Sequence, residues 1–208
     1  ALQCRVRGLN PKVIELDNYF VDRARTPLDE NGEYDFESLQ AMDLELLTNQ
    51  LNDLLSGKEI ELPKFDFKDG KSLKSGKKLH LDDNDILIME GIHALNPEMT
   101  SAVDNSRIFR VYASSLTSIS LDENNHISTT DTRLLRRIVR DNRTRSISPE
   151  ETIMRWTSIR RGEDRNIFPF QENADVCFNS ALNFDLPAIK HFLEPLLRRI
   201  SRRSPAYV

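Results

Sequence analysis

The sequence contains no long hydrophobic run. No apolar stretch among its 208 residues approaches the roughly 18 residues that a membrane-spanning helix needs, and no N-terminal secretory pattern is visible. Internal repeats and low-complexity segments are also absent. A hydrophobic content of 38% with a charged content of 30% predicts a globular protein that does not act in a membrane.

Cysteine is scarce as well. Cys4 and Cys177 are far apart in the sequence and lie in apolar surroundings, whereas disulfide frameworks and metal sites need more cysteines at closer spacing. We expect two reduced thiols in the core of a cytoplasmic protein.

Negative charge predominates overall, yet one segment is strongly basic. The formal net charge is -4, but residues 133–165 contain ten arginines and only five acidic residues. Residues 131–145, DTRLLRRIVRDNRTR, hold six of these arginines. This concentration of charge indicates an anionic ligand bound at one place, and it makes general affinity for nucleic acid a weaker interpretation.

Short apolar runs alternate with helical patterns along the chain. We expect strands at 12–16, 85–90, 107–114 and 174–180, and helices at 43–55, 131–145, 149–167 and 185–203. Residues 58–73 alternate apolar and polar side chains around Asp69-Gly70, which is typical of a β-hairpin arm. The alternation of strands and helices predicts an α/β fold with a parallel sheet flanked by helices.

The arginine segment is amphipathic when it is placed on a helix. At 100° per residue one face, from about 280° to 40°, carries Arg133, Arg136, Arg137, Arg140 and Arg143. The opposite face carries Leu134, Leu135, Ile138 and Val139. A solvated surface helix usually mixes charges of both signs, whereas arginine favours bidentate contacts with phosphate. We therefore favour a phosphate-binding helix, which Asp131 would cap or stabilise through the helix dipole.

Two acidic residues follow predicted strands. Asp17 comes after the apolar residues of 12–16, and Glu90 ends the run at 85–90. In open α/β sheets, ligands bind beyond the carboxyl ends of the strands. An acid there can be a structural group, a magnesium ligand or a general base. Together with a cationic helix, the pair suggests phosphoryl transfer.

Five motifs occur in an order that resembles a known family. LDNYF, YDFESLQAMDLELL, GKEIELPKFDF, ILIMEGIHAL and DTRLLRRIVRD together resemble the uridine kinase members of the phosphoribulokinase/uridine kinase family. The run NIFPFQENADVCFNSAL looks like the subgroup in which the kinase domain follows a region related to the N-terminal part of threonyl-tRNA synthetase. The resemblance covers roughly residues 1–198.

The resemblance implies a P-loop kinase fold and ATP-dependent, Mg²⁺-dependent phosphorylation of the 5′-hydroxyl of a pyrimidine nucleoside, uridine or cytidine. It implies that Asp17 is the catalytic base and that Glu90 helps to hold magnesium. The lid that closes over the phosphates, at about 129–167, would contribute Arg133, Arg136, Arg137, Arg140 and Arg145. The residues expected on the substrate side are Tyr19, Phe20, Asp35, Phe65 and His93, although a structural role for His93 is an equal alternative.

The chain departs from the family pattern at several positions. The GxxxxGK[ST] loop and the strand before it are missing, so we expect residues 1–208 to be a single kinase-like domain truncated before residue 1 and inactive by itself. Phe65 and Gly70 stand where the family has a tyrosine and a histidine that contact the base. Glu37 stands in place of a ribose-binding aspartate, and Ser146 in place of a glycine after the lid helix.

Other functions remain open at this stage. The acceptor could be another nucleoside or a phosphorylated sugar, and a non-catalytic module that binds RNA or another polyanion is the alternative from a different class. The partners expected for a kinase are a nucleoside and ATP, with no membrane and no nucleic acid. Assembly into a homo-oligomer is left open.

Overall fold

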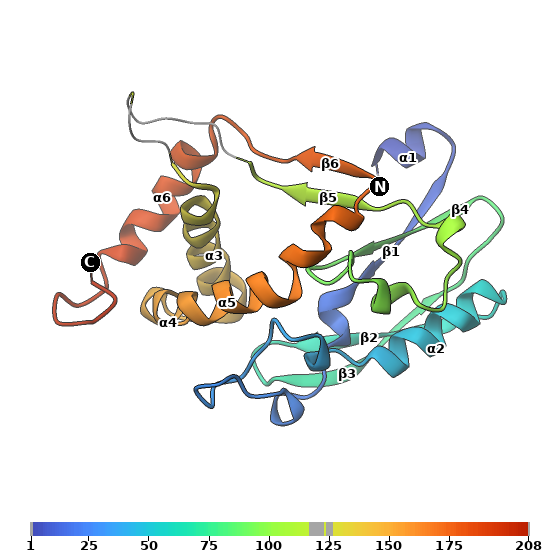
Figure 1. The fold of residues 1–208 in the computed structure, drawn as a ribbon, viewed down its shortest axis with the longest axis horizontal. Helices are drawn as coiled ribbons and strands as arrows, with labels where there is room; N and C mark the ends of the chain where they lie inside the picture. The colour runs from blue at the N-terminus through green and yellow to red at the C-terminus, as the bar shows by residue number, and fades with distance from the viewer. Residues whose placement is uncertain (1, 117–122, 124–126, 208) are drawn as a thin grey trace. The chain divides into compact units, whose positions relative to one another are not determined.

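The computed structural model describes residues 2–116, 123 and 127–207. The chain forms two compact units, whose elements are labelled in Figure 1. The first unit comprises Ala1–Arg110 and Gly162–Ala174, and the second comprises Val111–Arg161 and Asp175–Val208. Each unit has its own cluster of buried hydrophobic side chains.

The sheet of the first unit is a pair of parallel strands, β1 (Asn10–Glu15) and β4 (Asp85–Glu90). Their register runs from Asn10 opposite Asp85 to Glu15 opposite Glu90. Strand β4 coincides with the apolar run at 85–90, as predicted. The carboxyl ends of both strands lie at the same edge, where the 3-10 helix η1 (Leu16–Tyr19) follows β1.

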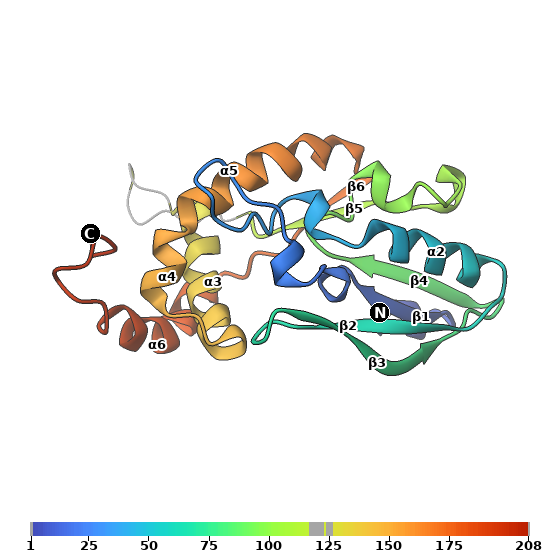
Figure 2. The ribbon, with the colours of Figure 1, turned by 90° about the horizontal axis from the view of Figure 1, so that it is seen from below.

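Strands β2 (Ile60–Asp66) and β3 (Lys71–Leu79) form the predicted antiparallel hairpin, which Figure 2 shows in side view. Asp66 closes the turn, because its Oδ1 accepts hydrogen bonds from the backbone N–H groups of Lys68 (2.9 Å) and Asp69 (3.1 Å). Gly70 ends the turn in the left-handed conformation, with φ of 66°, which glycine adopts without steric cost.

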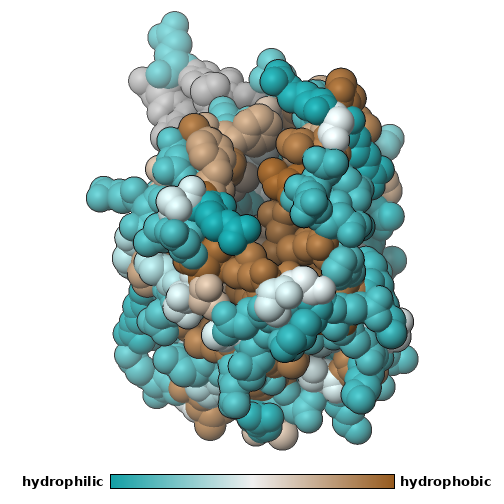
Figure 3. Space-filling view, turned by 90° about the vertical axis from the view of Figure 1, so that its right-hand side faces the viewer, coloured by the Kyte–Doolittle hydropathy of each residue, from teal (hydrophilic) through white to brown (hydrophobic). Residues whose placement is uncertain are grey.

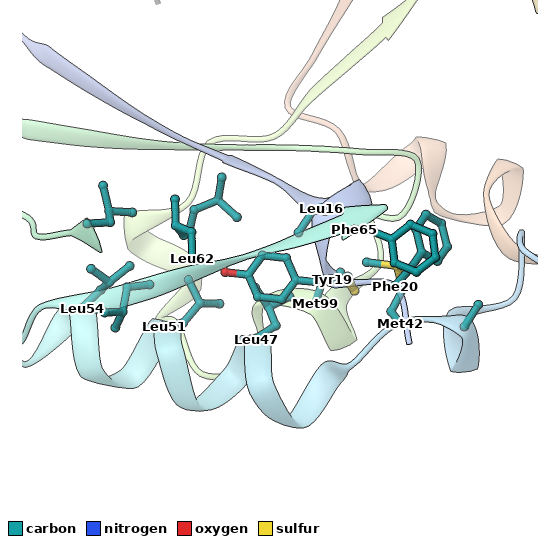
Figure 4. Packing of buried hydrophobic residues seen from close by; sticks show 14 of the residues in the cluster. Leu16, Tyr19, Phe20, Met42, Leu47, Leu51, Leu54, Leu62, Phe65 and Met99 are labelled. Atoms are coloured by element: carbon teal, nitrogen blue, oxygen red, sulfur yellow. The ribbon is translucent and has the colours of Figure 1, made fainter. Parts of the chain in front are cut away.

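Helix α2 (Leu44–Leu55) begins at the predicted cap, where an Asp43 carboxylate oxygen accepts a hydrogen bond from the backbone N–H of Leu46 at 3.0 Å. Its buried leucines recur at helical spacing and therefore lie on one face. Each contributes about 2 kcal/mol of burial free energy. Figure 4 shows this face packed within the core cluster that contains Leu47, Leu51, Leu54, Leu62, Tyr19 and Met99.

The second unit contains another parallel pair, β5 (Val111–Ser114) and β6 (Val176–Asn179). Its helices are α3 (Thr129–Arg145), α4 (Pro149–Met154) and α6 (Asp185–Leu197). Helix α5 (Trp156–Asn166) begins in this unit, and its last residues belong to the first. Ile138 of α3 is 1% exposed and packs with Leu193 and Leu196 of α6. This packing confirms the predicted apolar face of the arginine helix.

The remaining elements are short. They are α1 (Leu2–Val6) and the 3-10 helices η2 (Arg23–Arg25), η3 (Leu39–Ala41), η4 (Pro97–Thr100), η5 (Asn105–Arg107) and η6 (Phe168–Asn173).

Several boundaries differ from the sequence prediction. The cap of α3 is Ser128, whose hydroxyl accepts a hydrogen bond from the backbone N–H of Asp131 at 2.9 Å. Asp131 lies in the first turn, which fits the alternative prediction that it stabilises the helix through its dipole. The predicted helix at 149–167 divides at Arg155 into α4 and α5. The final helix ends at Leu197, six residues before the predicted end. The expected core position of the cysteines is wrong, since Cys4 is half-buried and Cys177 is exposed.

Some large apolar side chains reach the surface. Figure 3 shows apolar groups, in brown, exposed on the face that it draws. On the β5–β6 pair, Val111 is 47% exposed, Val176 44% and Phe178 59%.

Within the part of the chain that the structure describes, no helix is both long enough and apolar enough to cross a bilayer.

Candidate active site

Three carboxylates lie at the carboxyl edge of the β1–β4 pair. Glu15 and Glu90 are register partners at the last position of each strand, and Asp17 lies in η1, directly after β1. Glu90 is exposed, yet partial burial raises its pKa, and the negative charges of Asp17 and Glu15 raise it further. The electrostatic effect of Asp17 and Glu15 on Glu90 means that both carboxylates lie near it. The structure therefore places Asp17 and Glu90 together, as expected from the strand ends.

Glycine at position 91 allows the loop after β4 to approach η1 closely. A Cβ atom on Gly91 would lie 2.7 Å from the Cβ of Leu16, which is inside any van der Waals contact. Leu16 is 1% exposed, and a close-packed core does not let such a side chain move aside freely. Gly91 thus keeps Glu90 beside the short helix that carries Asp17.

Asn18 connects this acidic edge to the hairpin. Its Nδ2 donates a hydrogen bond to Glu15 Oε2 at 3.1 Å, and its Oδ1 accepts one from the backbone N–H of Phe65 at 3.2 Å. Neither Glu15 nor Asn18 was predicted from the sequence. The register of β1 against β4 is the signal for Glu15, because it places this residue opposite Glu90.

The aromatic residues expected on the substrate side lie in the core. Tyr19 is 1% exposed, Phe20 7% and Phe65 6%. The Tyr19 hydroxyl donates a hydrogen bond to Gln50 Oε1 at 2.6 Å, and the ring centroids of Phe20 and Phe65 are 5.6 Å apart. In this conformation the three rings stabilise the first unit by packing, and their contacts with a substrate stay a prediction.

His93 is buried in the loop after β4. It is 2% exposed, and burial lowers its pKa to about 4, while the backbone of Asn166 opposes this shift only in part. The imidazole is therefore neutral at pH 7. This placement fits the structural alternative for His93 at least as well as the substrate-side one.

Asp35 and Glu37 lie on a loop of the first unit. Asp35 Oδ1 accepts a hydrogen bond from the backbone N–H of Glu37 at 3.1 Å, and Glu37 is 7% exposed. Gly162 of α5 packs directly on this loop, since a Cβ atom there would lie 2.5 Å from the Cβ of Glu37. Asp35 is the more accessible of the two carboxylates, and its contact with a substrate stays a prediction.

An arginine lies against the tip of the hairpin. Arg23 Nη2 donates a hydrogen bond to the carbonyl oxygen of Phe67 at 2.8 Å, and its backbone N–H donates one to the carbonyl oxygen of Gly70 at 2.8 Å. A Cβ atom on Gly70 would lie 2.7 Å from Arg23 Nε and Cζ. The missing side chain at position 70 thus leaves room for a guanidinium group.

The arginines of α3 are engaged in ion pairs within the second unit. Arg136 Nη1 lies 2.9 Å from Asp185 Oδ2. Three others surround the buried carboxylate of Asp141, with N–O distances of 3.4 Å for Arg137, 3.1 Å for Arg140 and 3.6 Å for Arg145. Arg133 is half-buried on the same helix. The five predicted arginines therefore share one element, α3, but they do not form a simple row of solvated cations.

The acidic edge suits a divalent cation that also binds a substrate. Among the described residues, no three histidine, cysteine, aspartate or glutamate side chains are arranged to hold a metal ion by themselves. Magnesium in phosphoryl-transfer sites uses only one or two carboxylates, together with phosphate oxygens and water. The carboxylates of Asp17, Glu15 and Glu90 are of the residue type that such an ion binds, and the charges of Asp17 and Glu15 add to burial in raising the pKa of Glu90.

Comparisons with known proteins agree with this geometry. The sequence profile of the Phosphoribulokinase / Uridine kinase family matches residues 14–187. A uridine kinase from Halobacterium salinarum is 27% identical over 177 residues, which are 85% of this chain and 71% of that protein. One from Lactobacillus helveticus is 28% identical over 166 residues, 79% of this chain and 70% of that protein.

The fold has a counterpart among solved structures. A kinase structure from Silicibacter sp. TM1040 superposes with a TM-score of 0.52 at 14% sequence identity, covering 84% of this chain and 77% of that one. This likeness confirms the predicted α/β fold of the P-loop kinase type. With the family profile matched over most of its length, the chain belongs to the phosphoribulokinase/uridine kinase family.

Proposed function

We propose that the protein is a kinase that transfers a phosphoryl group from ATP to the 5′-hydroxyl of a pyrimidine nucleoside. The observation that carries the proposal is the placement of Asp17 beside Glu90 at the carboxyl edge of parallel strands, in a chain of this family. The relatives named uridine kinase support the choice of nucleoside.

The two carboxylates would have different roles. Asp17 would orient the acceptor hydroxyl and remove its proton, a contribution of about 10²–10⁴-fold in rate. Glu90 would help to hold Mg²⁺, directly or through water. A bound magnesium ion would offset negative charge on the transferring phosphoryl group. The position of Glu90 at the end of β4, opposite Glu15 and near Asp17, supports this division, because a cation there would offset the charges of neighbouring carboxylates.

The arginines of α3 would bind the phosphates of ATP. Guanidinium groups match phosphate oxygens in bidentate geometry, and excluding water around them would limit hydrolysis of ATP. Arg133, Arg136, Arg137, Arg140 and Arg145 are the residues we assign to this lid.

The acceptor could instead be a phosphorylated sugar, and one observation favours it. Arg23 lies against Gly70 at the tip of the hairpin, where the family has a histidine that contacts the base. A guanidinium there would favour an acceptor that carries a negative charge.

An activity assay on the full-length protein tests the proposal. Purified protein is incubated with ATP, Mg²⁺ and a panel of uridine, cytidine, purine nucleosides and sugar phosphates, and formation of the phosphorylated product is measured. We expect uridine and cytidine to be phosphorylated, and Asp17→Asn to lower kcat by about 10²–10⁴-fold.

The matched control is Asp83→Asn, which removes an exposed aspartate before β4, away from the carboxyl edge. This variant should keep wild-type kcat. If product formed only from sugar phosphates, the acceptor would be a sugar phosphate and the proposed nucleoside would be wrong. An Asp17→Asn variant with wild-type kcat would contradict the assignment of the base.

A further inference from the structure

Asp141 is the buried centre of an arginine cluster on α3. The residue is 3% exposed, in the last turns of a helix whose neighbouring side chains are mostly basic. Three guanidinium groups surround it, those of Arg137, Arg140 and Arg145, with N–O distances of 3.4, 3.1 and 3.6 Å. One carboxylate therefore contacts three guanidinium groups.

The position of Asp141 on the helix explains why it is buried. Counted from Arg133 at 100° per residue, Asp141 falls at about 80°, at the border between the arginine arc and the apolar arc. The apolar arc packs on α6 through Ile138. The carboxylate thus lies where the two faces meet, and the arginine side chains fold toward it from both helix directions.

The same residue also shapes the end of the helix. Its backbone carbonyl accepts hydrogen bonds from the N–H groups of Ser146 and Ile147, the latter at 3.2 Å. Asp141 is thereby fixed in main chain and side chain alike, which makes it a rigid support for long side chains that would otherwise sample many rotamers.

The three arginine side chains around Asp141 differ in their exposure to solvent. The side chain of Arg140 remains 50% exposed, whereas those of Arg137 and Arg145 are 21% and 19% exposed. The cluster thus presents a guanidinium group to solvent while the carboxylate holds its orientation. Ordering these side chains before a ligand arrives lowers the entropic cost of binding.

We propose that Asp141 is a positioning residue that preorganises Arg137, Arg140 and Arg145 into a binding cluster for the polyphosphate chain of the phosphate donor. The inference rests on the proposed kinase function and adds to it the residue through which the arginines act. Asp141 itself does not touch the ligand.

Removing the charge of Asp141 tests this role, because two explanations of Asp141 predict opposite changes in the affinity for polyphosphate. Asp141→Asn keeps the size of the side chain and removes one negative charge next to three positive ones. If Asp141 merely reduced the charge of the cluster, the variant would bind polyphosphate more tightly. If Asp141 positions the arginines, the variant loses affinity by about tenfold, because the guanidinium groups repel one another and spread.

Two readouts are measured on the full-length protein, well below its melting temperature. The first is the affinity for inorganic tripolyphosphate, measured by calorimetry at constant ionic strength. The second is the pair of KM for MgATP and kcat, which shows whether a variant changes KM separately from kcat. We expect Asp141→Asn to weaken tripolyphosphate binding and to raise KM, and Asp141→Glu to restore most of both. The control Glu194→Gln removes an acid paired with Arg198 on α6 and should change neither.

Arg140→Lys keeps the test decisive if Asp141→Asn does not fold. Arg140 is half exposed, so the substitution is tolerated, but a lysine ammonium cannot contact a carboxylate and a phosphate in the planar geometry of a guanidinium. We expect it to lose several-fold in tripolyphosphate affinity. An affinity equal to the wild type in this variant, or an unchanged or tighter affinity in Asp141→Asn, overturns the inference.

The outcomes separate this inference from the proposed function. A wild-type protein that binds tripolyphosphate through Asp141 but phosphorylates no acceptor would contradict only the kinase proposal. An active kinase whose KM and tripolyphosphate affinity do not change when Asp141 is substituted would contradict only the positioning role. A wild-type protein that binds no tripolyphosphate overturns the positioning role, and the activity assay then decides the kinase proposal separately.

Discussion

Glu90 is a carboxylate whose charged form is disfavoured by its surroundings. Partial burial and the charges of Asp17 and Glu15 raise its pKa above the ordinary value of 4.5, so the ionised form is disfavoured in the folded protein. Neutral glutamine at this position removes that repulsion. It also removes the carboxylate proposed to hold magnesium.

We predict that Glu90→Gln raises the free energy of unfolding at pH 7 and lowers kcat. The sign follows from linkage: a raised folded-state pKa favours the folded state at low pH, and this contribution is lost as pH rises through the folded pKa. The gain of the variant over the wild type should therefore be present at pH 7 and vanish below about pH 4.5. Urea denaturation at several pH values measures it.

Glu45→Gln is the matched control for this prediction, since Glu45 is an exposed glutamate in the first turn of α2. It should show no such gain in stability. A Glu90→Gln variant that is less stable than the wild type at pH 7 would show that Glu90 makes a favourable interaction instead.

Individual site residues were predictable where a simple rule applies to them. Asp17 and Glu90 follow apolar runs, and the convergence of parallel strand ends brings them together. Asp141 was visible only as the single acid of the helix after its first turn. Its contacts with three arginines depend on side-chain directions that the sequence pattern does not specify.

The end of helix α3 contains a strained backbone conformation. Ser146 follows the last arginine with φ of 56°, in the left-handed region that costs a residue with a side chain about 1–2 kcal/mol. Glycine usually occupies such a position after a helix. Two residues later, Ser148 begins α4 as part of a capping box with Glu151.

The same substitution should therefore have opposite effects at these two serines. We predict that Ser146→Gly raises the free energy of unfolding by about 1 kcal/mol, because the strain is relieved. Ser148→Gly should lower it by a few tenths of a kcal/mol or more, because a cap is lost. Urea denaturation of both variants measures the two changes, and a destabilised Ser146→Gly would show that the serine side chain outweighs the strain.

Elements with local signals were predicted well, and those that depend on their surroundings were not. The cap at Asp43 and the leucine spacing fixed α2, and the turn residues fixed the hairpin. The division of 149–167 at Arg155 lacks a local signal such as proline or glycine, so the sequence predicted one continuous helix. The burial of Tyr19 and Phe20 depends on packing against distant residues, which the LDNYF motif does not specify, and their contacts with a substrate stay a prediction.

The two units differ in how much apolar surface they bury. Among the described residues, fifteen buried hydrophobic side chains form the cluster of the first unit and three form that of the second. The second unit also exposes Val111, Val176 and Phe178 on its strands. Since apolar burial is the main stabilising term in folding, the first unit should be the more stable one. This division was not predictable from the sequence, because apolar runs of similar composition occur in both units.

The unfolding of residues 1–208 should therefore not follow a single transition. Trp156 is the one tryptophan of the chain and belongs to the second unit, so its fluorescence reports on that unit, whereas far-UV circular dichroism reports on both. We predict that the fluorescence midpoint in urea lies below the circular dichroism midpoint, which is the standard sign of non-two-state behaviour.

A double variant moves the tryptophan from the second unit to the first and so completes this test. In Trp156→Phe with Phe36→Trp, the tryptophan lies in the first unit, half-buried and near Phe20, since the centroids of Phe20 and Phe36 are 6.5 Å apart in the wild type. Its fluorescence midpoint should then lie at higher urea than that of Trp156. Coincident midpoints for both probes and for circular dichroism would mean that the units fold as one cooperative body, despite the unequal burial of apolar surface.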